Sequence, residues 1–265
     1  MSESITPENH ISGRDMFLDM RITHRVDVTP DLWIIRVERP AEFHFVAGQY
    51  ATLGVAAGER FIERAYSIAS SPYETELEFF LELVPQGELT PLLYRMKLGD
   101  SLICRKVPKG RFTLNTAGGS SHHLLICTVA GVAPFVSYVR TLLTDWHAGR
   151  FKGDQRLYVI QGASGSQEFG YRAEFEHIAS DVPWFTYVAT ISRPWDDPGW
   201  QGETGRLDDV IRKYADQWSL TPTNALAYFC GHPEMIEHGK AILRRRGWAK
   251  EGLREEAYFH ESHQV

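Results

Sequence analysis

The chain has 265 residues, of which 43% are hydrophobic and 23% are charged, so it is long enough to form two globular domains of ordinary size. Its net charge of -6 argues against a general nucleic-acid binder, which would present a basic surface. Because the sequence has no apolar run of about 18 residues and a polar N-terminus, we expect neither a membrane span nor a secretory signal, and we predict a cytoplasmic protein.

The three cysteines, Cys104, Cys127 and Cys230, lie far apart in the sequence, which fits reduced thiols better than a disulfide framework. An iron–sulfur centre needs about four clustered thiolates, so we do not expect this chain to hold one. Any such electron acceptor would be a separate molecule. The histidines are scattered except for the adjacent pair His122 and His123, and we therefore expect no metal site.

Strand signals dominate the first half of the chain, after a loose arm at residues 1–16. Runs of β-forming residues between Pro and Gly turns predict strands at residues 20–26, 32–37, 50–55 and 77–84. We expect the strand at 77–84 to pair with the strand that contains Arg64. With further strands at 102–104 and 109–114, the spacing suggests an antiparallel barrel, which a Gly- and Ser-rich linker at residues 115–121 follows.

The stretch Arg64-Ala65-Tyr66-Ser67 places a cation, an aromatic ring and a hydroxyl within one strand-like run. Residues two apart share a face of a strand, so Arg64 and Tyr66 should point the same way and Ser67 the opposite way. A guanidinium can bind a phosphate, and a tyrosine ring can stack on a flat heteroaromatic group. The alternative is an edge strand with a solvated arginine and a half-buried tyrosine.

A short helix is predicted to follow, with Thr90 as its N-cap and Pro91 in its first turn. The free amides at such a terminus suit a pyrophosphate, close to the positive charge that Arg64 would supply. A capped surface helix without a ligand is the alternative.

Strands and helices alternate in the second half, which is typical of a parallel sheet with crossover helices. Strands are predicted at residues 123–129, 157–162, 184–190 and 225–231, and helices at 135–146, 169–178, 207–214 and 233–246. A nucleotide bound to such a sheet should lie at the carboxyl ends of the strands.

Motifs in both halves resemble those of the ferredoxin-NADP(H) reductase family, and the resemblance runs from about Phe17 to the end of the chain. In the first half the motifs are F-x-A-G-Q-Y at residues 45–50, R-x-Y-S at 64–67 and V-P-x-G-x-L-T at 84–90. In the second half, residues 230–235 match C-G-x-P-x-M, whose cysteine lies by the nicotinamide carbon that exchanges hydride. Residues 129–134 resemble the pyrophosphate turn G-T-G-I-A-P.

That turn departs from the family pattern at two positions, where Val129 and Ala130 stand in place of the first Gly and the Thr. The departure removes a hydroxyl near the nicotinamide and narrows the turn. The resemblance leaves a phosphate contact through Gly131 and the following helix terminus.

The resemblance implies a two-domain fold, with an antiparallel β-barrel that binds FAD at residues 17–118 and an α/β domain with a parallel sheet that binds NADP(H) at residues 119–265. It implies FAD contacts at Arg64, Ala65, Tyr66, Ser67, Phe80, Leu81, Leu83, Val84, Glu88, Leu89 and Thr90. It implies nucleotide contacts at Ala130, Gly131, Pro134, Ser164, Ser192, Arg193, Arg206, Gly231 and Met235.

The choice of nucleotide depends on a few residues after the third strand of the second half. Ser192-Arg193 resembles the pair that grips the 2′-phosphate of NADP(H), and Arg206 resembles an arginine that assists it. Against this, Ser164 stands where several bacterial members have a further arginine. The resemblance favours NADPH over NADH.

The C-terminal aromatic pair, Tyr258 and Phe259, resembles the end of bacterial members of the family, which lies beside the flavin or its adenine. Either residue could make this contact, and an ordinary disordered tail is the alternative. These adenine-side residues make FAD the expected flavin rather than FMN.

On this resemblance we predict a ferredoxin- or flavodoxin-NADP+ reductase, in which hydride passes between NADPH and flavin N5 and single electrons pass to a separate carrier protein. Ser67 would hydrogen-bond near N5, Tyr66 would cover one ring face and Cys230 would position the nicotinamide. Two alternatives stay open. One is an NADH-dependent reductase component of an oxygenase system, and the other is a non-catalytic regulatory module without flavin.

Overall fold

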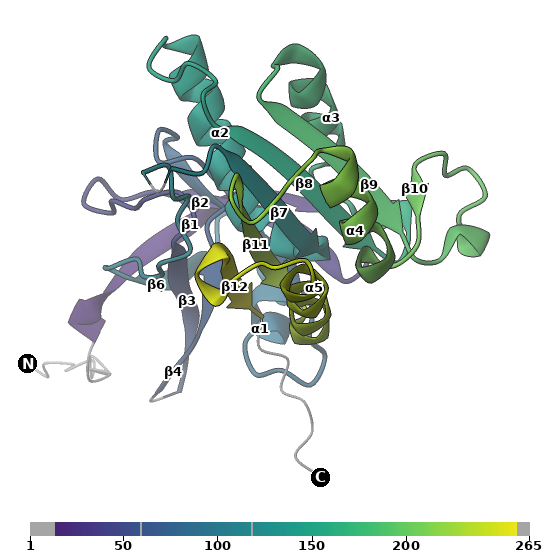
Figure 1. The fold of residues 1–265 in the computed structure, drawn as a ribbon. Coiled ribbons are helices and arrows are strands. Elements are labelled where there is room, and N and C mark those ends of the chain that lie inside the picture. The colour runs from purple at the N-terminus through teal and green to yellow at the C-terminus, as the bar shows by residue number, and fades with distance from the viewer. Residues whose placement is uncertain (1–13, 59, 118, 259–265) are drawn as a thin grey trace, which may run out of the picture.

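The computed structural model describes residues 14–58, 60–117 and 119–258, and these residues form two six-stranded sheets, one in each half of the chain (Figure 1). The first sheet is antiparallel and the second is parallel with helices on its faces, as the sequence predicts. Short 3-10 helices are η1 (Arg14–Met16), η2 (Val129–Val132), η3 (Ser166–Glu168), η4 (Pro194–Asp196) and η5 (Lys250–Gly252).

The antiparallel sheet has the strand order β4-β3-β6-β1-β2-β5. Its strands are β1 (Phe17–Asp27), β2 (Leu32–Glu38), β3 (Tyr50–Ala57), β4 (Arg60–Ser67), β5 (Glu76–Glu82) and β6 (Ser101–Arg105). β5 pairs with β2, where Ile34 lies opposite Phe80, so the predicted pairing of β5 with β4 is wrong. The alternation of apolar residues specifies the buried face of a strand, but it does not specify the neighbouring strand.

Residues 109–114 do not form the predicted strand, and the ladder contact found there is an isolated bridge between Tyr50 and Lys109. Phe112 is instead buried against Phe135, Tyr138 and Tyr228 of the second domain. The Tyr138 hydroxyl also donates a hydrogen bond to the Phe112 carbonyl. Because this ring is buried in the second domain, the segment does not pair with the edge of the barrel, and it stabilises the contact between the two domains.

Helix α1 (Thr90–Arg95) forms where a short helix was predicted, but the role predicted for Thr90 is wrong. Leu89 is the N-cap, and Thr90 is the first helical residue. The Thr90 hydroxyl accepts a hydrogen bond from Val84 N at 2.9 Å and donates one to Val84 O at 3.1 Å. It therefore closes the preceding loop, and no side chain caps the helix amides.

The parallel sheet has the strand order β10-β9-β8-β7-β11-β12. Its strands are β7 (His122–Thr128), β8 (Arg156–Ala163), β9 (Phe185–Ile191), β10 (Glu203–Thr204), β11 (Ala225–Gly231) and β12 (Leu253–Ala257). The last strand was not predicted, because its charged residues resemble a tail, yet Cys230 of β11 lies opposite Glu256 of β12. The strand order reverses between β7 and β11, and a ligand is expected in the crevice at such a switch point.

Four helices cover the two faces of this sheet. They are α2 (Ala133–His147), α3 (Arg172–Asp181), α4 (Leu207–Gln217) and α5 (Pro233–Arg245). Apolar residues of α2 and α3 share one core with Leu32, Ala69 and Phe80 of the first domain. Those of α4 and α5 form a separate core on the opposite side of the sheet. The first of these cores is continuous across the domain boundary.

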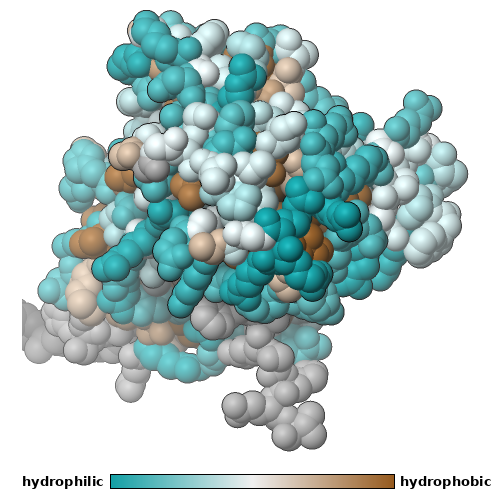
Figure 2. Space-filling model, viewed as in Figure 1, coloured by the Kyte–Doolittle hydropathy of each residue, from teal (hydrophilic) through white to brown (hydrophobic). Residues whose placement is uncertain are grey.

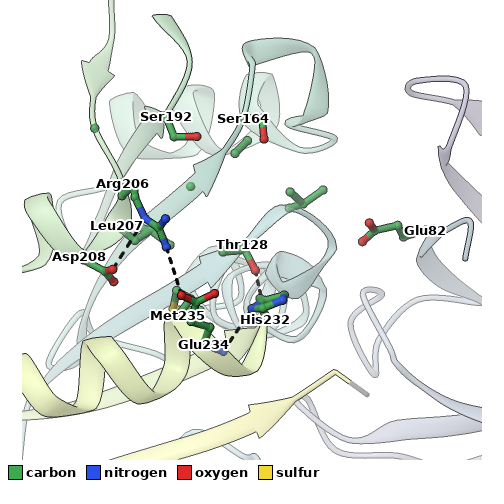
Figure 3. Close-up of a pocket in the computed structure, with 14 residues that line it drawn as sticks. Glu82, Thr128, Ser164, Ser192, Arg206, Leu207, Asp208, His232, Glu234 and Met235 are labelled. Atoms are coloured by element: carbon green, nitrogen blue, oxygen red, sulfur yellow. Dashed lines mark hydrogen bonds and ion pairs between the residues drawn. The ribbon is translucent and has the colours of Figure 1, made fainter. Parts of the chain in front are cut away.

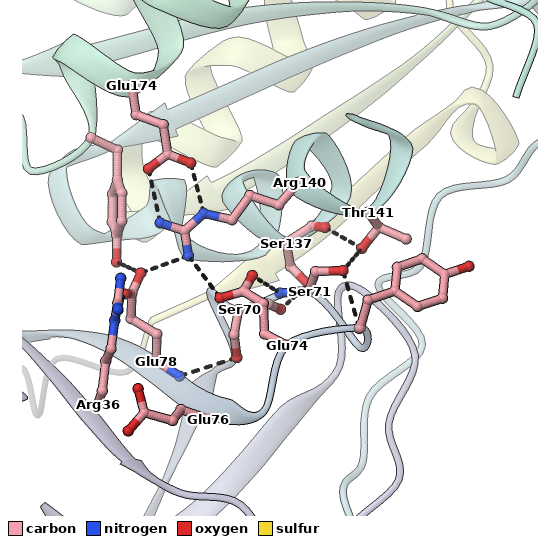
Figure 4. A network of polar contacts seen from close by, with 12 residues as sticks. Arg36, Ser70, Ser71, Glu74, Glu76, Glu78, Ser137, Arg140, Thr141 and Glu174 are labelled. Atoms are coloured by element: carbon pink, nitrogen blue, oxygen red, sulfur yellow. Dashed lines mark hydrogen bonds and ion pairs between the residues drawn. The ribbon is translucent and has the colours of Figure 1, made fainter. Parts of the chain in front are cut away.

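A network of polar contacts reinforces the same boundary (Figure 4). Glu78 of β5, only 3% exposed, accepts hydrogen bonds from Arg36 at 2.7 Å, from Arg140 of α2 at 2.9 Å and from Tyr171 at 3.0 Å. Arg140 also binds Glu174 of α3 with two hydrogen bonds, at 2.7 and 2.8 Å. The buried carboxylate is therefore compensated by cations from both domains.

The face of the molecule in Figure 2 is largely hydrophilic, with apolar residues in small separate areas. Large exposed hydrophobic side chains, among them Val26, Leu98, Val107 and Trp195, come from different elements of the fold. Within the described ranges, no helix has the length and apolar character that crossing a membrane requires.

Candidate active site

The two domains meet through a hydrogen bond between Ser67, at the end of β4, and Glu256 of β12. Ser67 is 6% exposed, and its hydroxyl donates to Glu256 Oε1 over 2.6 Å. Burial raises the pKa of Glu256, and the Ser67 hydrogen bond offsets only part of that effect. As predicted, Ser67 points away from the face that carries Tyr66, and its partner is a carboxylate that sequence reasoning missed.

Cys230, at the end of β11, lies in the same junction and is completely buried. Burial raises the pKa of its thiol, and the nearby Glu256 raises it further, so the thiol stays neutral. The Tyr258 hydroxyl donates to Ala130 O at 2.9 Å and interacts with the side chains of Ser67 and Cys230. Tyr258 therefore covers the tip of β11, while Phe259 lies outside the described residues.

The outward face of β4 carries Arg64 and Tyr66, as the alternation predicts. Tyr66 is half-buried against the barrel core, and burial raises its pKa while the positive charge of Arg64 lowers it. Arg64 is exposed and lies 3.5 Å from Glu88, just before α1. The structure thus brings Arg64 to the start of α1, where the pyrophosphate was expected.

Arg60, four residues before Arg64 and on the same face of β4, also contacts Glu88, at 2.9 Å. Sequence reasoning missed this second cation, because an arginine near a strand start is usually solvated. Two guanidiniums can together hold a diphosphate, since each offers several N–H donors in a fixed plane. The first turn of α1 adds little, because Pro91 has no N–H and the amides of Leu92 and Leu93 donate to Leu89 O. The first domain therefore fits the phosphate part of a flavin dinucleotide.

The remaining flavin residues predicted from the sequence fall into two groups. Phe80, Leu81 and Leu89 are buried in apolar cores, and Phe80 packs edge-on against Tyr171 of the second domain. Their side chains are therefore used in packing, and only their backbone could reach a ligand. Ala65 and Glu88 are exposed, whereas Leu83, Val84 and Thr90 are partly buried along the loop that leads to α1.

The turn after β7 approaches the end of β11 very closely. A side chain at Gly131 would collide with the backbone of Cys230, and one at Gly231 would collide with Thr128. The Thr128 hydroxyl accepts a hydrogen bond from His232 N at 3.1 Å, which holds the two turns together. Ala130, Gly131, Pro134 and Gly231, all predicted nucleotide contacts, are buried in this packing.

Val129 occupies the position where the family turn has its first glycine, and its φ is 39°. A left-handed backbone is costly for a β-branched residue. Gln161, fully buried on β8, donates from Nε2 to Val129 O at 3.2 Å, and its Oε1 accepts from the Tyr187 hydroxyl at 2.8 Å. The turn therefore accommodates Val129 in a strained conformation, and the side chain of Gln161 supports the turn through its hydrogen bond to Val129 O.

A pocket of about 280 Å³ opens beside this turn, at the carboxyl ends of the parallel strands (Figure 3). It is lined by Glu82, Thr128, Val129, Gly162, Ala163, Ser164, Ser192, Gly205, Arg206, Leu207, Asp208, His232, Glu234 and Met235. Glu82 comes from the first domain, so the pocket lies at the domain boundary. The structure brings together four predicted nucleotide contacts here, namely Ser164, Ser192, Arg206 and Met235.

Arg206 and Arg193 differ in their placement. Arg206 lines the pocket and lies 3.9 Å from Asp208 and 4.0 Å from Glu234. Arg193 is exposed outside the pocket lining, and its side chain makes no ion pair within residues 14–58, 60–117 and 119–258. Its backbone N instead donates to Ser164 O at 3.0 Å. The carboxylates beside Arg206 gave no sequence signal, because they begin two different helices, where acidic residues are common.

Known families match both domains. Residues 19–114 match the oxidoreductase FAD-binding domain, and residues 125–240 match the oxidoreductase NAD-binding domain. Ferredoxin-NADP reductase A of Sorangium cellulosum is 27% identical over 83% of this chain and 80% of its own length. Ferredoxin-NADP reductase of Pseudomonas aeruginosa is 28% identical over 80% of this chain and 83% of its length.

Reductase components of oxygenases are also similar. The phenol 2-monooxygenase reductase component of Pseudomonas sp. strain CF600 is 29% identical over 80% of this chain, which spans 57% of that protein. Among solved structures, a ferredoxin NADP+ reductase from Neisseria gonorrhoeae with bound FAD and NADP is 25% identical, with a TM-score of 0.81 over 92% of this chain and 99% of that one. With a family match on each of its two domains, the chain belongs to the ferredoxin-NADP(H) reductase family, as an oxidoreductase with an FAD-binding and an NAD(P)-binding domain.

Proposed function

We propose that this protein is an FAD-dependent reductase that takes electrons from NADPH and passes them singly to a separate carrier protein, ferredoxin or flavodoxin. The observation that carries the proposal is the bond between Ser67 and Glu256 beside Cys230. It joins β4, which carries the flavin motif, to β12, where Glu256 lies opposite Cys230 of the nicotinamide motif. A hydride donor and acceptor held in the two domains would therefore meet at this junction.

The residues of the first domain support flavin binding. Arg64 and Arg60 would neutralise the diphosphate, and Tyr66 would cover one face of the ring system. A bound flavin supplies the step from two-electron to one-electron transfer. Ser67 would orient the reacting edge, and Glu256 would fix the rotamer of the Ser67 hydroxyl.

In the second domain, Cys230 would provide a neutral, buried surface against the nicotinamide, because its raised thiol pKa prevents ionisation. Tyr258 closes the approach to Cys230 in this structure and would have to move before a nicotinamide reached it. Ser192, Ser164 and Arg206 would bind the 2′-phosphate of NADPH at the far end of the pocket. Excluding water from the junction would protect the transferred hydride.

Spectroscopy and rapid kinetics test this proposal directly. The purified protein should show flavin absorption, and mixing it anaerobically with NADPH should bleach the flavin band within one turnover. Addition of a ferredoxin or flavodoxin should restore the band. A protein that purifies without flavin and takes none up would contradict the proposal and favour the non-catalytic module.

A matched pair of variants tests the flavin site. Arg64→Ala should weaken FAD binding about ten- to a hundredfold, because a charge-assisted hydrogen bond contributes about 1.5 to 3 kcal/mol. Arg21→Ala is the control, since Arg21 is an exposed strand arginine whose partner, Glu38, lies outside the site. Equal FAD dissociation constants for both variants would show that the R-x-Y-S motif had been misread.

A second candidate is an NADH-dependent reductase component of an oxygenase system. The similarity to the phenol 2-monooxygenase reductase component and the carboxylates next to Arg206 favour it. The ratio of kcat/KM for NADPH to that for NADH decides between the two candidates. A ratio well above one supports the first, and a ratio well below one supports the second.

A further inference from the structure

The charge of the nucleotide pocket is unusual for a site that binds an additional phosphate. Among the described residues that line it, Arg206 is the one lysine or arginine, while Glu82, Asp208 and Glu234 contribute three carboxylates (Figure 3). A 2′-phosphate carries close to two negative charges at neutral pH and is repelled by carboxylates at short range. The pocket thus presents opposing charges to the same ligand group.

The geometry places two of these carboxylates directly on Arg206. Its Nε lies 3.9 Å from Asp208 Oδ2, and its Nη2 lies 4.0 Å from Glu234 Oε1. Both contacts are long, and the Arg206 side chain is 63% exposed, so the guanidinium remains accessible to a ligand. A phosphate that bound Arg206 would lie next to both carboxylates.

Asp208 and Glu234 come from the first turns of different helices, α4 and α5. Asp208 is 24% exposed and also lies 3.1 Å from His238 Nδ1, whereas Glu234 is 58% exposed at the rim. A carboxylate in such a position can accept hydrogen bonds from the 2′- and 3′-hydroxyls of an unphosphorylated ribose. The two side chains therefore suit NADH while they oppose the phosphate of NADPH.

We propose that Asp208 and Glu234 are specificity-determining residues that hold Arg206 and weaken its preference for the 2′-phosphate. The pocket then accepts both nicotinamide nucleotides and discriminates less between them than Arg206 alone would. The proposal rests on the function proposed above, since it concerns the same pocket, and it names the residues that set the nucleotide preference.

Two ligands that differ only in the 2′-phosphate provide the test: adenosine 2′,5′-bisphosphate and 5′-AMP. Their dissociation constants are measured by calorimetry on the flavin-loaded protein, for wild type, Glu234→Gln, Asp208→Asn and the double variant. The preference for the bisphosphate should rise about three- to tenfold with each substitution. It should rise more in the double variant, and added salt should reduce the gain.

Glu237→Gln is the matched control, because it removes one carboxylate from α5 that lies outside the pocket and binds Lys240 at 2.8 Å. It should leave the preference unchanged, and Arg206→Ala should remove the preference in every background. In steady-state kinetics, Glu234→Gln and Asp208→Asn should lower KM for NADPH relative to KM for NADH by the same factor, with kcat unchanged.

The outcomes separate the two proposals. If the wild type binds both ligands and the double variant keeps the wild-type preference, the role of Asp208 and Glu234 is overturned while the proposed function stands. If the wild type binds neither ligand, the proposed nucleotide function itself fails, and this inference fails with it. Glu234→Gln alone suffices if Asp208→Asn unfolds, since Glu234 lies at the exposed rim.

Discussion

Glu78 and Glu256 are both carboxylates at the boundary between the domains, but their surroundings differ. Burial alone would raise the pKa of Glu78, yet Arg140 and Arg36 outweigh burial, and the pKa is lowered. For Glu256, burial raises the pKa, and the hydrogen bond from the Ser67 hydroxyl lowers it only in part. The charge of Glu78 is thus compensated by ion pairs, whereas the carboxylate of Glu256 lies beside the Ser67 hydroxyl and the Cys230 thiol.

Because of this difference, we expect Glu78 to contribute to the stability of the fold and Glu256 to contribute to the proposed reaction. A carboxylate with cations from both domains holds the domains in one orientation. A carboxylate with a hydroxyl partner can orient that hydroxyl and respond to a change in charge nearby. The variants below should therefore act on folding at Glu78 and on electron transfer at Glu256.

The largest effect is expected at the ion-pair network. Arg140→Leu leaves Glu78 and Glu174 buried or half-buried without their shared cation, and it should lower the free energy of unfolding by about 3 to 5 kcal/mol. Urea denaturation measures the loss. Arg150→Leu removes an exposed arginine from the same region and should change stability little.

A double variant sharpens this test. Arg140→Leu combined with Glu78→Leu should recover part of the lost stability, because the unpaired carboxylate is then removed as well. If the single variant is as stable as the wild type, the network does not hold the domains together.

The next effect should be kinetic. Glu256→Gln keeps a hydrogen-bond acceptor for Ser67 but removes the charge, so flavin reduction by the nucleotide should slow about ten- to a hundredfold. The midpoint of thermal unfolding should not fall, because the substitution removes a buried charge whose pKa is raised. Stopped-flow absorbance measures the rate, and Glu255→Gln, which changes a carboxylate that binds Lys240, is the control. A wild-type rate in Glu256→Gln would show that Glu256 has no role at the proposed reacting junction.

The dependence of stability on pH should have opposite signs at the two glutamates. Because the folded-state pKa of Glu78 is lowered from 4.5, its stabilisation is present above that pH and is lost as pH falls through the lowered pKa. Because the folded-state pKa of Glu256 is raised from 4.5, its contribution is most favourable below that pH and is lost as pH rises through the raised pKa.

Urea titrations across this range check the signs. Glu78→Gln should flatten the acid limb of the stability curve, and Glu256→Gln should gain stability relative to wild type as pH rises from 4.5 toward neutrality. Curves that shift in the same direction for both variants would mean that the two carboxylates do not differ as the structure indicates.

The smallest effect concerns the strained turn at Val129, on the Glu256 side of the boundary. Val129→Gly should raise the free energy of unfolding by about 1 kcal/mol. Glycine removes the backbone strain of a β-branched residue at positive φ, and this gain exceeds the entropy that glycine loses on folding. Ser219→Gly is the control, because Ser219 follows α4 with a φ of 54° and the substitution relieves backbone strain away from the turn at Val129. Lower stability in Val129→Gly would show that the turn is not strained.

The hydrogen bond from Gln161 to Val129 O allows a second test of the strained turn. Gln161→Leu should weaken nucleotide binding in the wild-type background and weaken it less when residue 129 is glycine, which needs no support at positive φ. Equal losses in both backgrounds would mean that Gln161 acts independently of Val129.

The sequence predicted those features that depend on local order along the chain. Alternation placed Arg64 and Tyr66 on one face of β4 and Ser67 on the other, because side chains of a strand alternate whatever lies beside it. The change from strand spacing to strand–helix alternation identified the parallel sheet, and the turns at Gly131 and Gly231 marked the edge where a nucleotide is expected. The sequence showed that Val129 departs from the glycine of the family motif, but it did not predict the positive φ of this residue.

Tertiary structure decided which of these segments meet. Strand pairing put Glu256 beside Cys230 and β5 beside β2, and no local pattern distinguishes one partner strand from another. Burial drew Phe112 into the second domain, and folding brought Asp208 and Glu234 from two helices onto Arg206. Local patterns along the chain thus specify the strand faces, the turns and the chemical groups. The charge environment of each group depends on distances between segments far apart in the chain, and folding sets those distances.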